Sequence, residues 1–241
     1  RIAYRVCGAV SADSDVPLAV LIGLKNLLIG GFTRERFVEW LSLPIVSEKF
    51  DLESDDLAIL NRWLAAAGFE VGLNPAHLDA QRDAQAADPR QTQVYAPAAL
   101  HELTLERALE RLAFGWMLPQ DEDAAPYGDV LPVVGTELGG WDATGEKSGL
   151  LLKLANLYAV LETLRLKTAE GEKLTDGTSA HFWTLWIGEV LQKCFPAETP
   201  QRDWLAIRRA AADLADEIAQ ARDEAERIPD VSFEIFIAAL E

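Results

Sequence analysis

The 241-residue sequence contains few of the residues on which metal-bound and disulfide-bonded folds rely, with two cysteines, three histidines and one methionine. Cys7 and Cys194 lie far apart and neither belongs to a CxxC pair, which argues against a zinc ribbon, a thioredoxin-type motif and a disulfide scaffold. A reducing cytoplasm is therefore the expected compartment. The apolar runs are far shorter than the roughly 18 to 20 residues that a membrane span requires, so we expect no transmembrane helix and no membrane partner.

Positive charge is also scarce, because 39 acidic residues outnumber 22 basic ones and give a formal net charge of -17 at pH 7. Phosphate contacts need local positive potential, so this charge argues against a free-standing nucleic-acid binder and favours a basic partner surface or simple solubility. Hydrophobic residues make up 49% of the chain, enough for one or two globular domains with a full core. Arg1 opens the chain without a signal-like region, so we expect an excised piece of a longer protein.

The spacing of apolar residues predicts a mainly α-helical fold with one N-terminal strand. Ile2, Tyr4 and Val6 alternate with their neighbours before Gly8, as in a strand. Helical spacing, N-caps and glycine or proline stops predict helices for most of the remaining chain. The predicted helices run from Asp15 to Gly30–Gly31, Thr33 to Pro44, Ser54 to Gly68, Leu103 to Pro119, Leu150 to Leu166, Thr178 to Phe195 and Asp203 to Arg227, and Val231 to Leu240 is a short helix or a strand.

Two stretches interrupt this helical pattern. Asn74–Pro97 is rich in Ala, Gln, Asp and Pro and is predicted to be loop or marginal helix. Gln120–Gly149 contains three consecutive acids, several glycines and prolines, and is predicted to be a long surface loop.

The segment Gly140–Ser148 resembles a phosphate-binding loop but has the wrong spacing. In a Walker A motif the lysine directly follows the second glycine, whereas Glu146 separates Gly145 from Lys147 and adds a repelling charge. No nucleotide site is therefore predicted there.

The residues that could bind metal also lack the required spacing. His101-Glu102 has no second histidine four residues after the first, and a three-histidine site would need His77, His101 and His181 to converge. Asp121-Glu122-Asp123 lacks the alternating oxygen ligands and central glycine of a calcium loop, so it is interpreted as a solvated acidic loop.

A Cys–His nucleophile is excluded within the predicted helix that holds Cys194 and His181, because thirteen residues span about 20 Å at 1.5 Å per residue. Cys194 is interpreted as a small buried hydrophobe. Phe182, Trp183 and Trp186 have the spacing of a buried helix face, and no basic residue lies among them as a base-stacking platform would require.

Arg107 and Arg111 lie one helical turn apart and could contact phosphate. Glu106 and Glu110 beside them are the predicted helical ion-pair partners. From the residues alone, we therefore predict no catalytic, cofactor-binding or metal-binding residue and no cofactor.

A series of segments in chain order resembles the RecC family, the gamma subunit of exodeoxyribonuclease V. The segments are Ile2–Val6, Leu18–Leu28, Phe37–Pro44, Phe50–Leu57, Leu60–Trp63, Ala67–Leu73, Arg111–Met117, Asp129–Pro132, Leu150–Leu166 and Trp183–Leu191. The resemblance implies the helical region that corresponds to the 2B domain of superfamily 1 helicases. Residues 1–8 would then contribute a strand to the parent 2A domain, and residues 9–241 would form the 2B-like domain.

The resemblance further implies a non-catalytic scaffold domain, because RecC is helicase-like in fold but lacks the ATPase motifs. Within the RecBCD helicase–nuclease, it would act in double-strand break repair and homologous recombination. Its partners would be the beta (RecB-like) and alpha (RecD-like) subunits, with DNA bound through the parent complex. Three alternatives stay open: the related AddB subunit, a stand-alone acidic protein-binding module, and an enzyme that uses carboxylates of Asp121–Asp129 with a divalent ion.

Overall fold

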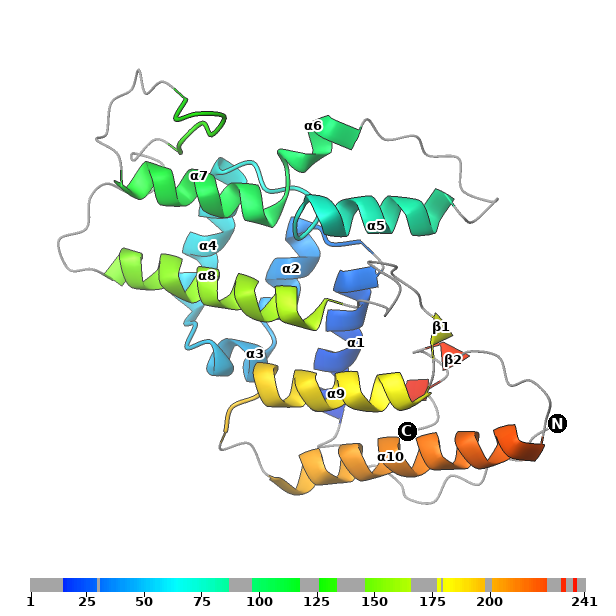
Figure 1. The fold of residues 1–241 in the computed structure, drawn as a ribbon. Helices are drawn as coiled ribbons and strands as arrows, with labels where there is room; N and C mark the ends of the chain where they lie inside the picture. Colours follow the sequence, from blue (N-terminus) through cyan, green and yellow to red (C-terminus); the bar gives the residue numbers. More distant parts are fainter. Residues whose placement is uncertain are drawn as a thin grey trace. The chain divides into compact units, whose positions relative to one another are not determined.

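A computed structural model describes residues 15–29, 31–86, 97–117, 126–133, 146–165, 177–178, 180–197, 201–224, 231–232 and 236–237. Within these ranges the chain is mainly helical, as predicted (Figure 1). The chain divides into two compact units. We call residues 25–174 the central unit, and residues 1–24 with 175–241 the terminal unit.

The helix α1 (Asp15–Ile29) belongs to both units, because its first ten residues fall in the terminal unit and the remainder in the central unit. The predicted glycine stop is confirmed, since Gly31 has a φ of 118°, a conformation that side chains rarely adopt. Most apolar residues of α1 are buried, although Ile22 remains 36% exposed.

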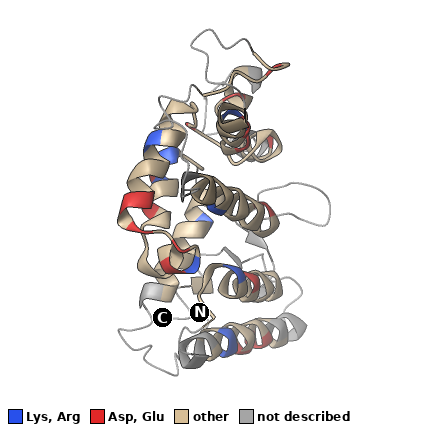
Figure 2. Cartoon of the chain, turned by 90° about the vertical axis from the view of Figure 1, so that its left-hand side faces the viewer, with Lys and Arg blue, Asp and Glu red and all other residues tan. Residues whose placement is uncertain are grey.

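The central unit contains seven further helices within its described residues. They are α2 (Arg34–Leu41), α3 (Pro44–Lys49), α4 (Ser54–Ala66), α5 (Pro75–Ala86), α6 (Pro97–His101), α7 (Leu105–Met117) and α8 (Glu146–Leu164). Helix α4 packs against α2 and α7, and α7 packs against α8. Acidic and basic positions are mixed along the same helices, as Figure 2 shows, so the described helices carry no long stripe of one sign.

The core of the central unit contains a cluster of three phenylalanines and one histidine. Phe32 stacks on Phe37 with ring centroids 5.5 Å apart, and Phe37 meets Phe69 edge-on at 5.9 Å. The ring of His77 contacts Phe32 edge-on at 5.8 Å. All four side chains are fully buried, so aromatic packing joins the starts of α2 and α5 to the end of α4.

Residues 70–73 connect α4 to α5, and their backbone donates hydrogen bonds to Phe32 before α2 and to Leu103 before α7. Gly72 N–H donates to Phe32 O at 2.7 Å, while Glu70 and Val71 N–H both donate to Leu103 O. Gly72 has a φ of 84°, and an added Cβ would lie 3.3 Å from both Leu78 and Thr104, so this close approach requires glycine.

The terminal unit is built around α9 (Ala180–Cys194) and α10 (Gln201–Glu224), which pack against each other. The Thr184 hydroxyl of α9 donates to Ala211 O of α10 at 3.0 Å. Two short strands, β1 (Gly177–Thr178) and β2 (Val231–Ser232), pair antiparallel.

Most predicted helices are confirmed, including the Thr33 N-cap of α2 and the Gly68 stop of α4. One difference concerns Asn74–Pro97, predicted to be loop or marginal helix, where Pro75–Ala86 forms a regular helix. A short helix at Pro97–His101, beyond that stretch, was not predicted. The Asn74 side chain accepts from His77 N–H and Pro75 follows it, which is a standard helix start. Tertiary contacts of His77 and Gln81 compensate for the weak helical pattern of α5.

Other boundaries also differ from prediction. Helix α2 ends at Leu41, before the predicted stop at Pro44, and Pro44 instead begins α3, because proline is tolerated in a first helical turn. Thr178 belongs to a strand instead of a helix, since its backbone pairs with Val231. Helix α8 begins at Glu146, inside the predicted 120–149 loop, and the predicted strand Ile2–Val6 lies outside the described residues.

We expect His77→Leu to destabilise the fold by about 1–3 kcal/mol. Leu73 N–H donates to His77 Nδ1, so the opposite nitrogen carries the proton that is donated to Leu28 O at 2.8 Å. Leucine would remove both bonds and leave the buried Leu73 N–H without this acceptor.

Urea unfolding measures this effect, with His181→Leu on the exposed surface of α9 as the control. The control should change the free energy of unfolding by less than about 0.5 kcal/mol. Equal effects of the two substitutions would contradict the role assigned to His77.

Candidate functional site

The central unit contains a buried polar network that joins the start of α5 to α8. Asn74 Oδ1 accepts from His77 N and from Arg165 Nη1, both at 2.8 Å. Asn74 Nδ2 donates to Glu162 Oε2 at 2.7 Å and to the Tyr158 hydroxyl at 3.4 Å. Every donor and acceptor position of this amide is therefore used, which offsets the cost of burying it.

Tyr158 extends this network to α7, because its hydroxyl donates to Glu106 Oε1 at 2.9 Å. Burial is the main cause that raises the pKa of Tyr158, so the phenol stays protonated at neutral pH. A protonated phenol that already donates to a carboxylate acts as a structural bridge and not as a base.

A second polar cluster lies at the surface of α7, and we call it the Arg107 cluster. The Arg107 guanidinium binds Glu102 at 2.9 Å, Glu110 at 2.8 Å, and both the carbonyl and the carboxylate of Asp129 at 2.8 Å. Arg111 shares Glu102 at 2.9 Å and also donates to Ala67 O at 3.0 Å. The cluster thereby ties together α4, α7 and residues 102 and 129.

The charges of the Arg107 cluster reinforce one another. The hydrogen bond with Glu102 is the main cause that raises the pKa of Arg107, and the same bond lowers the pKa of Glu102. A hydrogen bond from Arg107 also lowers the pKa of Asp129. All three groups are therefore charged at neutral pH, as a salt-bridge network requires.

The turn formed by residues 126–133 is held against α7 by this cluster. Val133 N–H donates to Arg111 O at 3.1 Å, and Tyr127 and Val130 form a backbone bridge. Gly128 closes the turn with a φ of 64°. Val130 and Val133 are buried, whereas Tyr127 and Leu131 are 60% and 56% exposed. The turn therefore presents two large apolar side chains to solvent from a fixed backbone.

Comparison with known families assigns the chain. A family model described as RecBCD enzyme subunit RecC, fourth domain, matches residues 15–241. The chain belongs to the RecC family. A search among curated proteins gave no match. Family membership makes this RecC domain part of the RecBCD enzyme, exodeoxyribonuclease V, which acts in DNA repair and recombination.

The three histidines of the RecC domain do not share a site: His77 and His101 have different partners, and His181 is exposed. His77 binds the backbone of Leu28 and Leu73, and His101 lies 3.2 Å from Asp79. His181 is exposed on α9. Among the described residues, no three His, Cys, Asp or Glu side chains form a group that could hold a metal ion.

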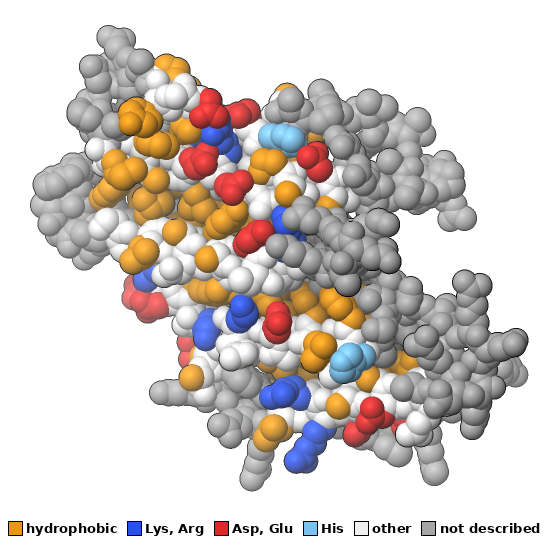
Figure 3. Space-filling model, viewed as in Figure 1, with side chains coloured by type: hydrophobic (Ala, Val, Ile, Leu, Met, Phe, Trp, Pro, Cys, Tyr) orange, Lys and Arg blue, Asp and Glu red, His pale blue; other side chains and the backbone are white. Residues whose placement is uncertain are grey.

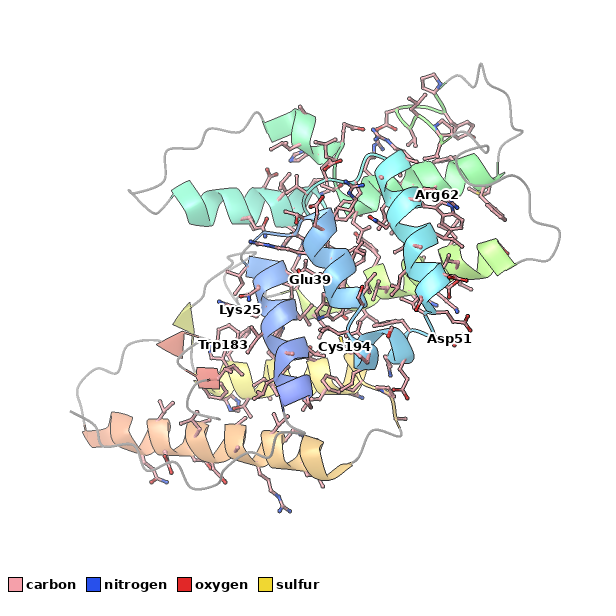
Figure 4. All side chains as sticks on the ribbon, turned by 180° about the vertical axis from the view of Figure 1, so that it is seen from behind. Lys25, Glu39, Asp51, Arg62, Trp183 and Cys194 are labelled. Carbon is pink, nitrogen blue, oxygen red and sulfur yellow. The ribbon has the colours of Figure 1, made fainter. Side chains whose placement is uncertain are left out.

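The interpretation of α9 is confirmed for Trp183, Trp186 and Cys194 in the terminal unit, whereas Phe182 is only partly buried. Trp183 and Trp186 are buried and meet edge-on with centroids 6.0 Å apart, and Cys194 is fully buried (Figure 4). His181 lies at the other end of the same continuous helix from Cys194.

The described helices include none that combines the length and the apolar character needed to cross a bilayer.

The predicted ion pairs of α7 are confirmed only in part. Arg107 does bind Glu110, but Glu106 accepts from Tyr158, and Arg111 binds Glu102. Sequence spacing could not identify Glu102 as the shared acid, because it precedes α7 in the chain. Residues 121–123 and 140–145, where the acidic triplet and the phosphate-loop comparison fall, lie outside the described residues.

The polar network contains residues that sequence reasoning missed, namely Asn74, Tyr158, Glu162 and Arg165. A partial signal was present for Asn74, since an asparagine followed by Pro75 is typical of a helix N-cap. Glu162 and Arg165 are spaced as a helical pair, and they do lie 3.5 Å apart. Their convergence on Asn74 is a tertiary feature without a local signal.

We expect Glu102→Gln to destabilise the RecC domain by roughly 0.5–1 kcal/mol at pH 7, because Glu102 is partly exposed and solvent screens its pairs with both arginines. Its pKa is lower in the folded state, so the stabilisation is present above the ordinary glutamate pKa. It is lost as the pH falls through the lowered folded-state pKa.

Urea unfolding of wild type and variant, from neutral pH to below the lowered folded-state pKa of Glu102, measures the difference in their free energies of unfolding. This difference should disappear at low pH. Glu39→Gln, at an exposed position of α2 (Figure 4), is the matched control and should leave stability unchanged. A difference that stays constant as the pH falls would contradict the assignment.

Two glycine substitutions should have opposite effects. A Cβ at Gly115 would lie 2.2 Å from Val133 O, so Gly115→Ala must displace the turn and should cost about 1–3 kcal/mol. Nothing lies within 4 Å of a Cβ at Gly188 on α9, so Gly188→Ala should stabilise the helix by about 0.5–1 kcal/mol. Thermal unfolding measures both, and equal stabilisation by the two alanines would show that the turn does not pack on α7.

Proposed function

We propose that the chain is a non-catalytic scaffold domain of the RecC subunit, corresponding to the 2B region of superfamily 1 helicases. The main observation in support of this proposal is the family match over residues 15–241. The domain supports the beta and alpha motor subunits through the parent protein in the cytoplasm. DNA is engaged by the assembled complex, and the net charge of -17 favours protein partners over phosphate for this domain itself.

The use of polar side chains supports a structural role. The buried amide of Asn74 and the buried guanidinium of Arg165 bind each other and link helices. The Tyr158 phenol bridges α8 to Glu106 of α7. Groups that satisfy one another in this way stabilise a single arrangement of helices, as a scaffold requires.

The alternative of a carboxylate enzyme with a divalent ion loses one of its candidate ligands in the structure. The Asp129 carboxylate lies 2.8 Å from the Arg107 guanidinium, and a cation at this position would compete with that charge. Arg107 is also held by Glu102 and Glu110, so it remains beside Asp129.

We expect the purified chain to hydrolyse no ATP above a matched blank, with or without DNA, and to give no saturable heat with magnesium, manganese or calcium. Phosphate release and calorimetric titration provide these readouts. ATP hydrolysis that copurifies with the chain through successive columns would contradict the non-catalytic role.

The scaffold role has a separate test in the full RecC subunit. Affinity purification through RecC should retain the beta and alpha subunits, and replacing residues 15–241 by a short linker should lower their recovery at least about tenfold. Circular dichroism and gel filtration of the shortened RecC check that the remainder folds. Undiminished recovery with a folded shortened RecC would overturn the scaffold proposal.

A further inference from the structure

An exposed apolar surface lies beside the Arg107 cluster. Met117, Tyr127 and Leu131 are 68%, 60% and 56% exposed, and the Tyr127 ring lies 5.1 Å from that of Phe114. Phe114 and Met117 are three residues apart on α7 and so share a helix face. We call these four residues the apolar patch. Figure 3 shows hydrophobic side chains gathered over this end of α7 and the neighbouring turn.

The apolar patch is preorganised. Arg107 fixes Asp129 through both its carbonyl and its carboxylate, and Val133 N–H binds Arg111 O. Gly115 allows Val133 O to approach α7 more closely than any side chain would permit. The Tyr127 ring packs on Phe114 from a rigid backbone and loses little conformational freedom on binding, which favours an interaction surface.

The border of the apolar patch is acidic. Three carboxylates, those of Glu102, Glu110 and Asp129, surround the guanidinium groups of Arg107 and Arg111, so the group keeps one net negative charge. Figure 3 shows acidic groups around a basic one next to the apolar side chains. Asp129 is 86% exposed, so its charge faces solvent at the edge of the apolar patch. The border therefore attracts lysine or arginine.

We propose that the apolar patch docks a segment of another RecBCD subunit that carries apolar side chains flanked by Lys or Arg. Acidic steering accelerates an encounter by diffusion, which matters for a separate subunit and not for a tethered neighbouring domain. A second copy of this chain is disfavoured, because two acidic borders and two net charges of -17 would repel. The inference rests on the proposed scaffold function and adds a location to it.

The test uses the full RecC subunit assembled with its beta and alpha subunits. A photoreactive benzoylphenylalanine replaces Leu131, and crosslinked peptides are identified by mass spectrometry. We expect a crosslink to the beta or alpha subunit at an apolar segment with Lys or Arg within a few residues. Benzoylphenylalanine in place of Leu185, which is 58% exposed on α9, is the control and should not capture the same segment.

A paired substitution measures the strength of docking. Tyr127→Ser combined with Leu131→Ser should lower recovery of the crosslinked subunit at least about tenfold, because two exposed apolar anchors are lost. Leu185→Ser combined with Leu205→Ser removes two exposed leucines of the terminal unit and should leave recovery unchanged. Unfolding midpoints should stay close to wild type for both pairs, which excludes misfolding as the cause.

The outcomes separate this proposal from the scaffold function. A crosslink within RecC, to a second RecC or to an acidic segment overturns the docking proposal, as does full recovery with the serine pair. If recovery still depends on residues 15–241, the scaffold function stands without this surface. A crosslink to a basic apolar segment of a protein outside RecBCD overturns the choice of partner.

Discussion

The central unit depends on one short connection, residues 70–74, whose backbone and whose Asn74 side chain are hydrogen-bonded to several other parts of the chain. Gly72 N–H reaches Phe32 O, and Gly72 O accepts from Leu105 N–H, so the connection lies between the segment before α2 and the start of α7. Asn74 at its end caps α5 and binds both Glu162 and Arg165 of the α8 region. Four parts of the chain therefore take their positions from five residues, and a side chain larger than hydrogen at position 72 would separate them.

Polar and charged side chains have different roles inside the central unit and at its surface. The buried network uses Asn74, Tyr158 and Arg165 to satisfy polar groups that would otherwise be costly to bury. At the surface, Arg107 and Arg111 concentrate acidic residues and fix the turn at residues 126–133. Glu106 connects the two, because it extends from α7 to Tyr158. The strongly acidic composition thus includes carboxylates with specific structural partners as well as solubilising charge.

Another surface pair shows how α8 is secured to the chain between α3 and α4. Asp51 has a φ of 52°, which is unusual for a residue other than glycine, and lies in the turn between these helices (Figure 4). Lys153 of α8 lies 2.9 Å from its carboxylate and also donates to its carbonyl. One lysine thus holds the residue with the least favourable backbone conformation in this turn.

The sequence by itself determined the mainly helical class, most helix positions, the Thr33 cap, the Gly31 and Gly68 stops and the burial of Trp183 and Cys194. These features follow from local spacing and capping chemistry, which nearby residues specify. Only the tertiary structure decided that Pro75–Ala86 is a helix, that Thr178 pairs with Val231 and that Glu102 serves two arginines. Each of these depends on a partner outside the element concerned, often dozens of residues away, and such partners leave no periodic signal in the chain.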